Sequence, residues 1–240
     1  MNKKSISQNT FYTIIWKPLF FRCSYYNWNN KIKTRENKNT LAEEIGISCE
    51  RLIFANQRHT DKVKIVTKDN YMEEVEADAM ITKEAGIALA TLTADCIPII
   101  FSDLETWAIG SIHAGSQGLK NLIIQNTFDA LKFEFWSSLK QVQIFIGPAI
   151  SQKFYEVWKE FLEFFDNKYL LSWKPGKYFL DIKTIAKHQC IELWIQKKNI
   201  QISDICTYED QDNFHSYRRK THKDYPNYGN NACVIWKEKT

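Results

Sequence analysis

A chain of 240 residues that is 44% hydrophobic and 25% charged has enough apolar material to close a sizeable core without disulfides. Its 32 lysines and arginines against 28 aspartates and glutamates leave a net charge of only +4, and "RRKTHK" is the one local basic cluster. So little clustered positive charge argues against a nucleic-acid partner.

Targeting and membrane segments are not expected either. Lys17 and Pro18 interrupt the apolar part of the opening "MNKKSISQNTFYTIIWKPLFF", and no small-residue cleavage site follows. The most apolar segment, 86–101, contains Asp95 and is too short to span a bilayer. The six cysteines stand at no paired spacing, which favours reduced thiols. We therefore expect a cytoplasmic protein with no membrane partner.

The first half of the chain is predicted to be rich in short strands. "TLAEEIG" is predicted to be a helix with Thr40 as its N-cap, Glu43 completing a capping box and Gly46 as its stop. Short apolar or alternating runs bounded by turn residues are typical of strands. These runs are "FYTIIW" (11–16), "LFFRC" (19–23), "VKIV" (63–66), "ADAMIT" (77–82), "IALATL" (87–92), "IPIIF" (97–101) and "WAIGSI" (107–112).

Helices and strands then alternate. Helical periodicity predicts helices over 119–133, 156–165 and 182–198, the last with Asp181 as N-cap. Strands are predicted over 142–147, 202–208 and 232–237. Because no repeat or linker divides the chain, we predict a single domain over 1–240, of the α+β class, with mixed β-sheets packed between flanking helices.

Two reactive side chains interrupt the apolar strands around residue 100. If Asp103–Thr106 form a four-residue hairpin loop, Ser102 pairs with Trp107, and Cys96 lies directly opposite His113. Their Cβ atoms would then be about 4.5–5.5 Å apart. A thiol facing an imidazole could be a nucleophile with its base, two ligands of a metal site, or a buried cysteine beside a hydrogen-bonded histidine. The pattern alone leaves all three open.

A metal site would need a third ligand. His188 lies two positions from Cys190 in a predicted helix, so the two do not share a face. His215 and His222 flank the basic "SYRRKTH" and are assigned to a polar loop. His59 follows the strand-like "RLIF" and lies in a polar turn, where ligands often occur. His59 is therefore the best remaining candidate.

An anion site is predicted after His113. The glycine-rich "AGSQGLKNL" is a strand-to-helix turn with Ser116 as a candidate N-cap, and backbone N–H groups at such a terminus can hold phosphate. Arg218 and Arg219 could add a bidentate clamp.

At this point the motifs resemble a known family. The laccase-domain family was once labelled multicopper polyphenol oxidases and is now described as purine nucleoside phosphorylases with adenosine deaminase activity. The resemblance runs from about residue 37 to the final "ACVIWK". It is carried in order by "NQRHTDKV", "ADAMIT", "GIALATLTADCIPI", "GSIHAGSQG", "IGPAI", "FYEV", "FLDI" and "CTYEDQDNFHSYRR".

The resemblance implies a zinc held by His59, Cys96 and His113, and an enzyme acting on a purine nucleoside and phosphate. Phosphorolysis of adenosine, inosine or methylthioadenosine and deamination of adenosine are both expected. Copper is disfavoured, because a multicopper site needs on the order of ten histidines and this chain has five. The motifs predict no particular oligomeric state.

Roles follow for the remaining site residues. Asp95 is the nearest carboxylate for proton transfer in deamination, while Arg218 and the amides of Gly115–Gly118 would hold phosphate. Two alternatives stay open: an amidase or deamidase that uses Cys96, and a non-catalytic nucleoside-binding protein.

The chain departs from the family's usual sequence in its loops. Ser116 and Gln117 stand where the family usually has Trp and Arg, Arg58 and Thr60 flank His59 in place of Val and Gly, and "GNNA" replaces Gly-Arg-Met-Ala. Because Gln117 is uncharged, we expect weakened phosphorolysis and better-preserved deamination.

Overall fold

The computed structural model describes residues 3–4, 19–23, 31–223 and 229–237. Its α-helices in these ranges are α1 (Lys31–Ile45), α2 (Ser116–Lys120), α3 (Ile123–Phe135), α4 (Ile182–Glu192) and α5 (Tyr217–Lys223). Short 3₁₀ turns occur at Cys49–Arg51, Gln152–Phe154, Lys159–Glu163, Asn167–Tyr169 and Lys197–Asn199. None of these described helices combines the length and apolar character that crossing a membrane requires.

The strands form three sheets, two of them large. The five-stranded sheet runs in the order β1 (Lys3–Lys4), β2 (Leu19–Cys23), β14 (Asn230–Trp236), β6 (Ala88–Thr93), β3 (Leu52–Phe54). The six-stranded sheet runs β13 (Ile200–Ile202), β9 (Val142–Ile146), β7 (Ile97–Asp103), β8 (Ile109–Ala114), β5 (Ala79–Thr82), β4 (Val63–Ile65). A small sheet holds β10 (Glu156–Trp158), β12 (Lys177–Leu180) and β11 (Leu170–Lys174).

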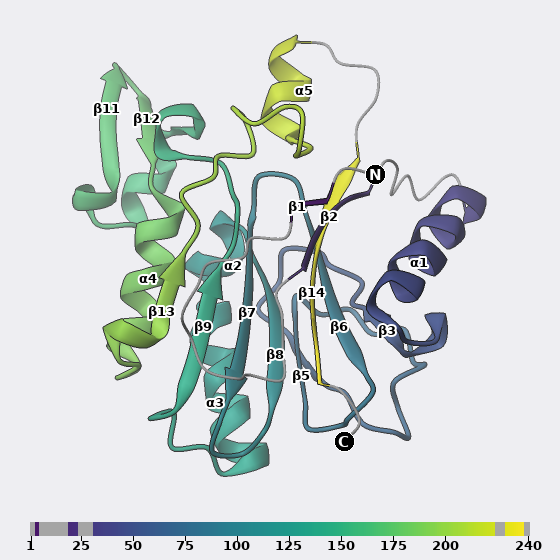
Figure 1. The fold of residues 1–240 in the computed structure, drawn as a ribbon. Helices are drawn as coiled ribbons and strands as arrows, with labels where there is room; N and C mark the ends of the chain where they lie inside the picture. Colours follow the sequence, from purple (N-terminus) through teal and green to yellow (C-terminus); the bar gives the residue numbers. More distant parts are fainter. Residues whose placement is uncertain (1–2, 5–18, 24–30, 224–228, 238–240) are drawn as a thin grey trace.

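The two large sheets pack face to face between helices (Figure 1). Leu41 and Ile45 of α1 pack with Ala90 and Val234 on the outer face of the five-stranded sheet. Helices α2, α3 and α4 cover the outer face of the six-stranded sheet. Phe128 of α3 is one of the largest fully buried side chains in this layer. Each large sheet mixes parallel and antiparallel pairs. The predicted fold class is confirmed; the single domain over all of 1–240 stays a prediction.

Strand alternation decides which side chains lie between the sheets. Leu89 of β6 packs there with Ile100 of β7 and Ile109 of β8, whereas their neighbours along each strand face the helices. Towards the ends of β6 and β8 this apolar layer turns polar: Thr91 and Ser111 share a short, buried hydrogen bond between their hydroxyls. The same alternation then directs Thr93 and His113 into the space between the sheets.

The predicted hairpin register is wrong by two residues. Pro98, not Cys96, lies opposite His113, and Ser102 pairs with Ile109. The loop is Leu104–Trp107, because the Asp103 amide donates to the Ala108 carbonyl at 2.8 Å and the Asp103 carboxylate accepts from Glu105 N and Thr106 Oγ1. A shift of two keeps every side chain on its predicted face, so Cys96, one residue before β7, still lies near His113.

Several helix predictions need correction. Thr40 does not start its helix: α1 begins at Lys31, and the Thr40 hydroxyl bonds the Glu36 carbonyl. Gly46 does end it, at φ +73°. The predicted helix over 119–133 is divided into α2 and α3 at Leu122, which takes φ 61°. Residues 156–165 form β10 and a 3₁₀ turn instead of an α-helix.

The remaining elements follow the predictions more closely. Asp181 caps α4 by accepting from Thr184 N at 3.0 Å, although the helix ends at Glu192. The strand predicted over 202–208 is wrong: β13 covers Ile200–Ile202, and only an isolated bridge at Cys206 lies within the remaining residues. The expected strand 11–16 lies outside the described residues.

Candidate metal centre and cavity

Three side chains from separate parts of the chain converge at one end of the layer between the sheets. His59 lies in the loop between β3 and β4, Cys96 in the turn between β6 and β7, and His113 on β8. One ligand atom of each lies within 4.8 Å of the other two, and Cys96 Sγ is 3.7 Å from His59 Nε2. The proposed His59–Cys96–His113 grouping is therefore present, although the register that suggested it is not.

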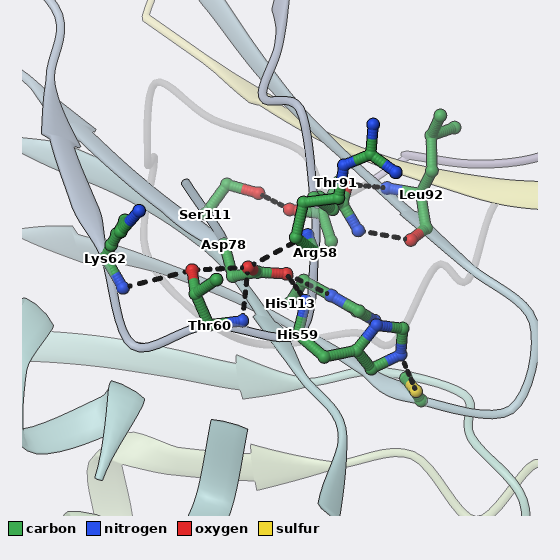
Figure 2. Close-up of polar contacts among 11 residues, drawn as sticks. Arg58, His59, Thr60, Lys62, Asp78, Thr91, Leu92, Ser111 and His113 are labelled. Atoms are coloured by element: carbon green, nitrogen blue, oxygen red, sulfur yellow. Dashed lines mark hydrogen bonds and ion pairs between the residues drawn. The ribbon is translucent and has the colours of Figure 1, made fainter. Parts of the chain in front are cut away.

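Asp78 connects the His59 loop to β8 (Figure 2). Its carboxylate accepts from the backbone N–H groups of Arg58, His59 and Thr60 at 2.6–3.1 Å, and from Thr60 Oγ1 at 2.7 Å. It also lies 2.7 Å from His113 Nδ1. Since a carboxylate can only accept, Nδ1 carries the proton and His113 Nε2 is the atom free to bind a metal.

The ionisation of Asp78 and Cys96 suits metal binding. Burial alone would raise the pKa of Asp78, but hydrogen bonds from His113 and Thr60 outweigh it and hold the pKa well below its usual range. Burial would also raise the pKa of the Cys96 thiol, but the neighbouring imidazoles, His113 above all, lower it. Thiolate is the form of cysteine that binds metals, so these imidazoles favour the ligating state.

The geometry and donor set fit zinc. Imidazole nitrogen and thiolate sulfur are both zinc ligands, and three protein ligands leave the fourth tetrahedral position open. Bond lengths of about 2.0–2.1 Å to nitrogen and about 2.3 Å to sulfur place tetrahedral ligand atoms roughly 3.3–3.6 Å apart. The observed 3.7 Å between Cys96 Sγ and His59 Nε2 differs little from that. The remaining pairs of ligand atoms lie within 4.8 Å of one another, so the three side chains could hold a metal after moving inward.

The backbone around the ligands is specialised. His59 takes φ 62° and Asp95 takes φ 96°, both in the left-handed region that non-glycine residues seldom occupy. Such conformations persist where the surroundings stabilise them, and the Asp78 carboxylate does so for His59. Gly115 lies against the cluster, since a Cβ there would meet Cys96 Sγ at 2.9 Å and His59 Cδ2 at 3.0 Å. Only glycine leaves the two ligands in place.

The three candidate ligands line a cavity of about 470 Å³, within the size range of small-molecule sites. Its walls combine apolar and polar groups from β6, the β6–β7 turn, α5 and neighbouring segments. The other lining residues are Ala55, Gln57, Leu92, Thr93, Ala94, Asp95, Ser116, Tyr155, Ile182, Tyr217, Arg218 and Asn230.

Asp95 lines this cavity, and both of its carboxylate oxygens already have partners within the protein. One carboxylate oxygen accepts from Thr207 Oγ1 and the other from the backbone N–H of Arg218, each at 2.7 Å. It thereby holds the start of α5 over the cavity. Its predicted part in proton transfer stays a prediction, and the described contacts give it an anchoring role.

The predicted anion-binding residues fall into different environments. Arg218 lines the cavity, with its guanidinium over the Tyr155 ring and Nη1 donating to the Glu156 carbonyl at 3.0 Å. Arg219 instead donates to the carbonyls of Thr207, Tyr208 and Phe214, so its proposed place in the clamp is wrong.

The loop after His113 also differs from expectation. Gly115, not Ser116, is the N-cap of α2. Ser116 is buried at the cavity and accepts a hydrogen bond from Tyr155 at 2.9 Å. Gln117 is exposed and is not among the residues that line the cavity.

The other histidines lie apart from the candidate ligands. His188 Nδ1 lies 2.8 Å from the Tyr169 hydroxyl, and Cys190 is fully buried, which raises the pKa of its thiol to about 12. Both are structural, as expected. His215 exchanges backbone hydrogen bonds with the Asn231 side chain and is buried, so it does not belong to an exposed polar loop.

Sequence reasoning missed two important residues. Asp78 precedes a strand within "ADAMIT", and an aspartate before an apolar run is the only trace of its role. Tyr155 lines the cavity, and burial, the largest cause, raises the pKa of its phenol to about 12. No spacing rule connects either of them to Cys96.

Comparison with known proteins identifies relatives over most of the chain. Residues 20–238 match the family model described as multi-copper polyphenol oxidoreductase laccase. A purine nucleoside phosphorylase of Aquifex aeolicus is 38% identical over 176 residues, which are 73% of this chain and 80% of that protein. One from Corynebacterium glutamicum is 32% identical over 207 residues, 83% of this chain and 80% of its own length.

Solved structures share the fold. The hypothetical protein YfiH of Bacillus licheniformis superposes with a TM-score of 0.85 at 22% identity, covering 93% of both chains. YlmD from Geobacillus stearothermophilus gives the same TM-score and identity, covering 94% of this chain and 93% of its own.

Removing the thiolate tests the ligand set. Cys96→Ala deletes its only sulfur donor, so zinc content should fall from about one equivalent per chain to near zero after desalting. His188→Ala is the matched control and should leave zinc content unchanged, because His188 contacts Tyr169 instead. Elemental analysis of both variants checks this. A requirement for His188 but not for His59 would contradict the ligand assignment.

Asp78→Asn tests the support behind the ligands. The amide keeps the size of the side chain but cannot accept every hydrogen bond now made to the carboxylate. Losing such a partner typically costs 10- to 100-fold in metal affinity. Competition with a chromogenic chelator measures this, with the exposed Asp129→Asn as control. An unchanged zinc affinity in a folded variant would show that Asp78 does not position the ligands.

Proposed function

Because this chain belongs to the multi-copper polyphenol oxidoreductase laccase family, and its three candidate ligands open onto a small-molecule cavity, we propose that it is a zinc-dependent purine nucleoside phosphorylase. We propose adenosine deamination as its second activity. The observation that carries this proposal is the His59–Cys96–His113 cluster in the cavity wall, together with relatives named purine nucleoside phosphorylase at about 30% identity.

Each candidate ligand contributes a defined function. His59 Nε2, His113 Nε2 and the Cys96 thiolate would hold zinc, and Asp78 fixes the orientation of His113. When bound, zinc supplies a Lewis acid that polarises an oxygen in the cavity. The five histidines of the chain do not suffice for a multicopper centre, which argues against the oxidase chemistry in the family's name.

Phosphorolysis would place the two substrates in the same cavity. A phosphate oxygen attacks C1′ of the ribose, the bond from C1′ to the base breaks, and the departing base takes up the proton that hydrogen phosphate gives up. Arg218 is the cationic side chain on the cavity wall, and a guanidinium has five N–H groups, enough to keep its contact with Glu156 and bind phosphate. Gln117, which is exposed and outside the cavity lining, adds no charge to this site, so we propose a high phosphate requirement.

Aromatic and apolar groups would receive the base. Tyr155, Tyr217, Leu92 and Ile182 line the cavity and can exclude water from a bound purine. Gln57 stiffens one wall, because its amide exchanges hydrogen bonds of 2.7 and 2.9 Å with the backbone of Leu92.

A turnover assay tests this function. Zinc-loaded protein is incubated with adenosine, inosine or methylthioadenosine, with and without phosphate, and the products are separated by chromatography. We expect free base only with phosphate, inosine from adenosine without it, and loss of both after chelation. Absence of every product at high enzyme concentration would refute the proposal.

Arg218→Gln tests the phosphate site. Loss of one charge-assisted contact should raise the KM for phosphate roughly ten- to a hundred-fold, while deamination, which uses no phosphate, changes less. Arg51→Gln, far from the cavity, is the control. Initial rates against phosphate concentration check the result. An unchanged KM for phosphate would place the anion elsewhere.

A further inference from the structure

One buried hydroxyl in the cavity wall has no hydrogen-bond partner among the described residues. Thr93 is only 2% exposed, it is one of the residues that line the cavity, and its buried Oγ1 makes no hydrogen bond with the described residues. Buried hydroxyls are nearly always paired, because leaving one unpaired costs free energy. The exception at Thr93 therefore calls for a partner.

Its neighbours in the cavity wall are already paired. Gln57 is paired with the Leu92 backbone, both oxygens of Asp95 accept hydrogen bonds, and Ser116 accepts from Tyr155. These groups line the cavity, but partners within the protein already use much of their hydrogen-bonding capacity. Thr93 keeps both its donor and its acceptor capacity.

The fold places Thr93 beside the candidate ligands. Thr91, two residues earlier on β6, contacts Ser111 on β8, and His113 stands two residues after Ser111. Side chains two apart on a strand share a face, so Thr93 and His113 both point into the space between the sheets. Both line the same cavity. Thr93 therefore lies where a molecule bound at the metal centre would present polar atoms.

We propose that the Thr93 hydroxyl is a substrate-binding group that hydrogen-bonds a polar atom of the bound nucleoside. This inference rests on the proposed function. A hydroxyl donates to a carbonyl and accepts from an amino group, so Thr93 serves 6-oxo and 6-amino purines equally. A ribose hydroxyl offers the same chemistry, and the choice of nucleoside analogues separates the two.

Two Thr93 variants and one control test the proposal. Thr93→Val removes the hydroxyl at nearly constant volume, and Thr93→Ser restores it without the methyl group. Thr127→Val removes a buried hydroxyl outside the cavity, one that bonds the Ile123 carbonyl. All three are zinc-loaded, checked for metal content and stability, and titrated calorimetrically with adenosine and inosine. We expect Thr93→Val to weaken binding of both roughly ten-fold, with Thr93→Ser close to wild type and Thr127→Val unchanged.

Analogues then locate the partner atom. Purine riboside lacks the six-position substituent, and 2′-deoxyadenosine and 5′-deoxyadenosine each lack one ribose hydroxyl. The analogue that lacks the partner should bind wild type and Thr93→Val equally, which would support the proposal and identify the atom.

Three results would overturn it. Equal binding by wild type and Thr93→Val would refute the role of Thr93 while the proposed function stands. Loss of zinc in Thr93→Val would show that the hydroxyl acts through the metal ligands instead. If wild type neither binds nor converts any nucleoside, the proposed function fails, and this inference fails with it.

Discussion

The candidate site depends on one carboxylate. Asp78 accepts three backbone N–H groups of the His59 loop and bonds His113 of the neighbouring strand. Charge-assisted hydrogen bonds of this kind are among the stronger ones in proteins. They hold His59 in a left-handed conformation and fix the proton on the far nitrogen of His113. Without them, two of the three candidate ligands would have no common support.

The proximity of Cys96 and His113 could be predicted even though the register of the two strands could not. The four-residue loop begins at Leu104, because Asp103 stays in the ladder and bonds the turn residues with its side chain. This moves the register by two, and an even shift preserves the face on which each side chain lies. The alternation of apolar residues along a strand encodes the face of the sheet on which each side chain lies. The distance along the strand depends on turn hydrogen bonds, which the alternation does not reveal.

Elements that depend on tertiary contacts were harder to predict. Helical periodicity continues through Leu122, yet the helix breaks there: α2 begins beside the ligands, with Gly115 as its N-cap, and α3 covers the sheet. Arg219 follows Arg218 in sequence, but three backbone carbonyls bind its guanidinium. Neighbouring arginines look equivalent in a sequence. Only the packing of α5 separates the cavity-lining one from the structural one.

The altered loop is consistent with this distribution of polar groups. Ser116 stands where the family usually has a tryptophan, and it is buried and bonded to Tyr155. A hydroxyl fills less of the cavity than an indole ring would. It also accepts the hydrogen bond that the Tyr155 hydroxyl donates. The Tyr155 ring in turn lies beneath the guanidinium of Arg218. The loop, the aromatic ring and the cationic side chain thus form one connected part of the cavity wall. Substitutions at Ser116 would therefore act on nucleoside and phosphate binding together, while the metal ligands keep their own support.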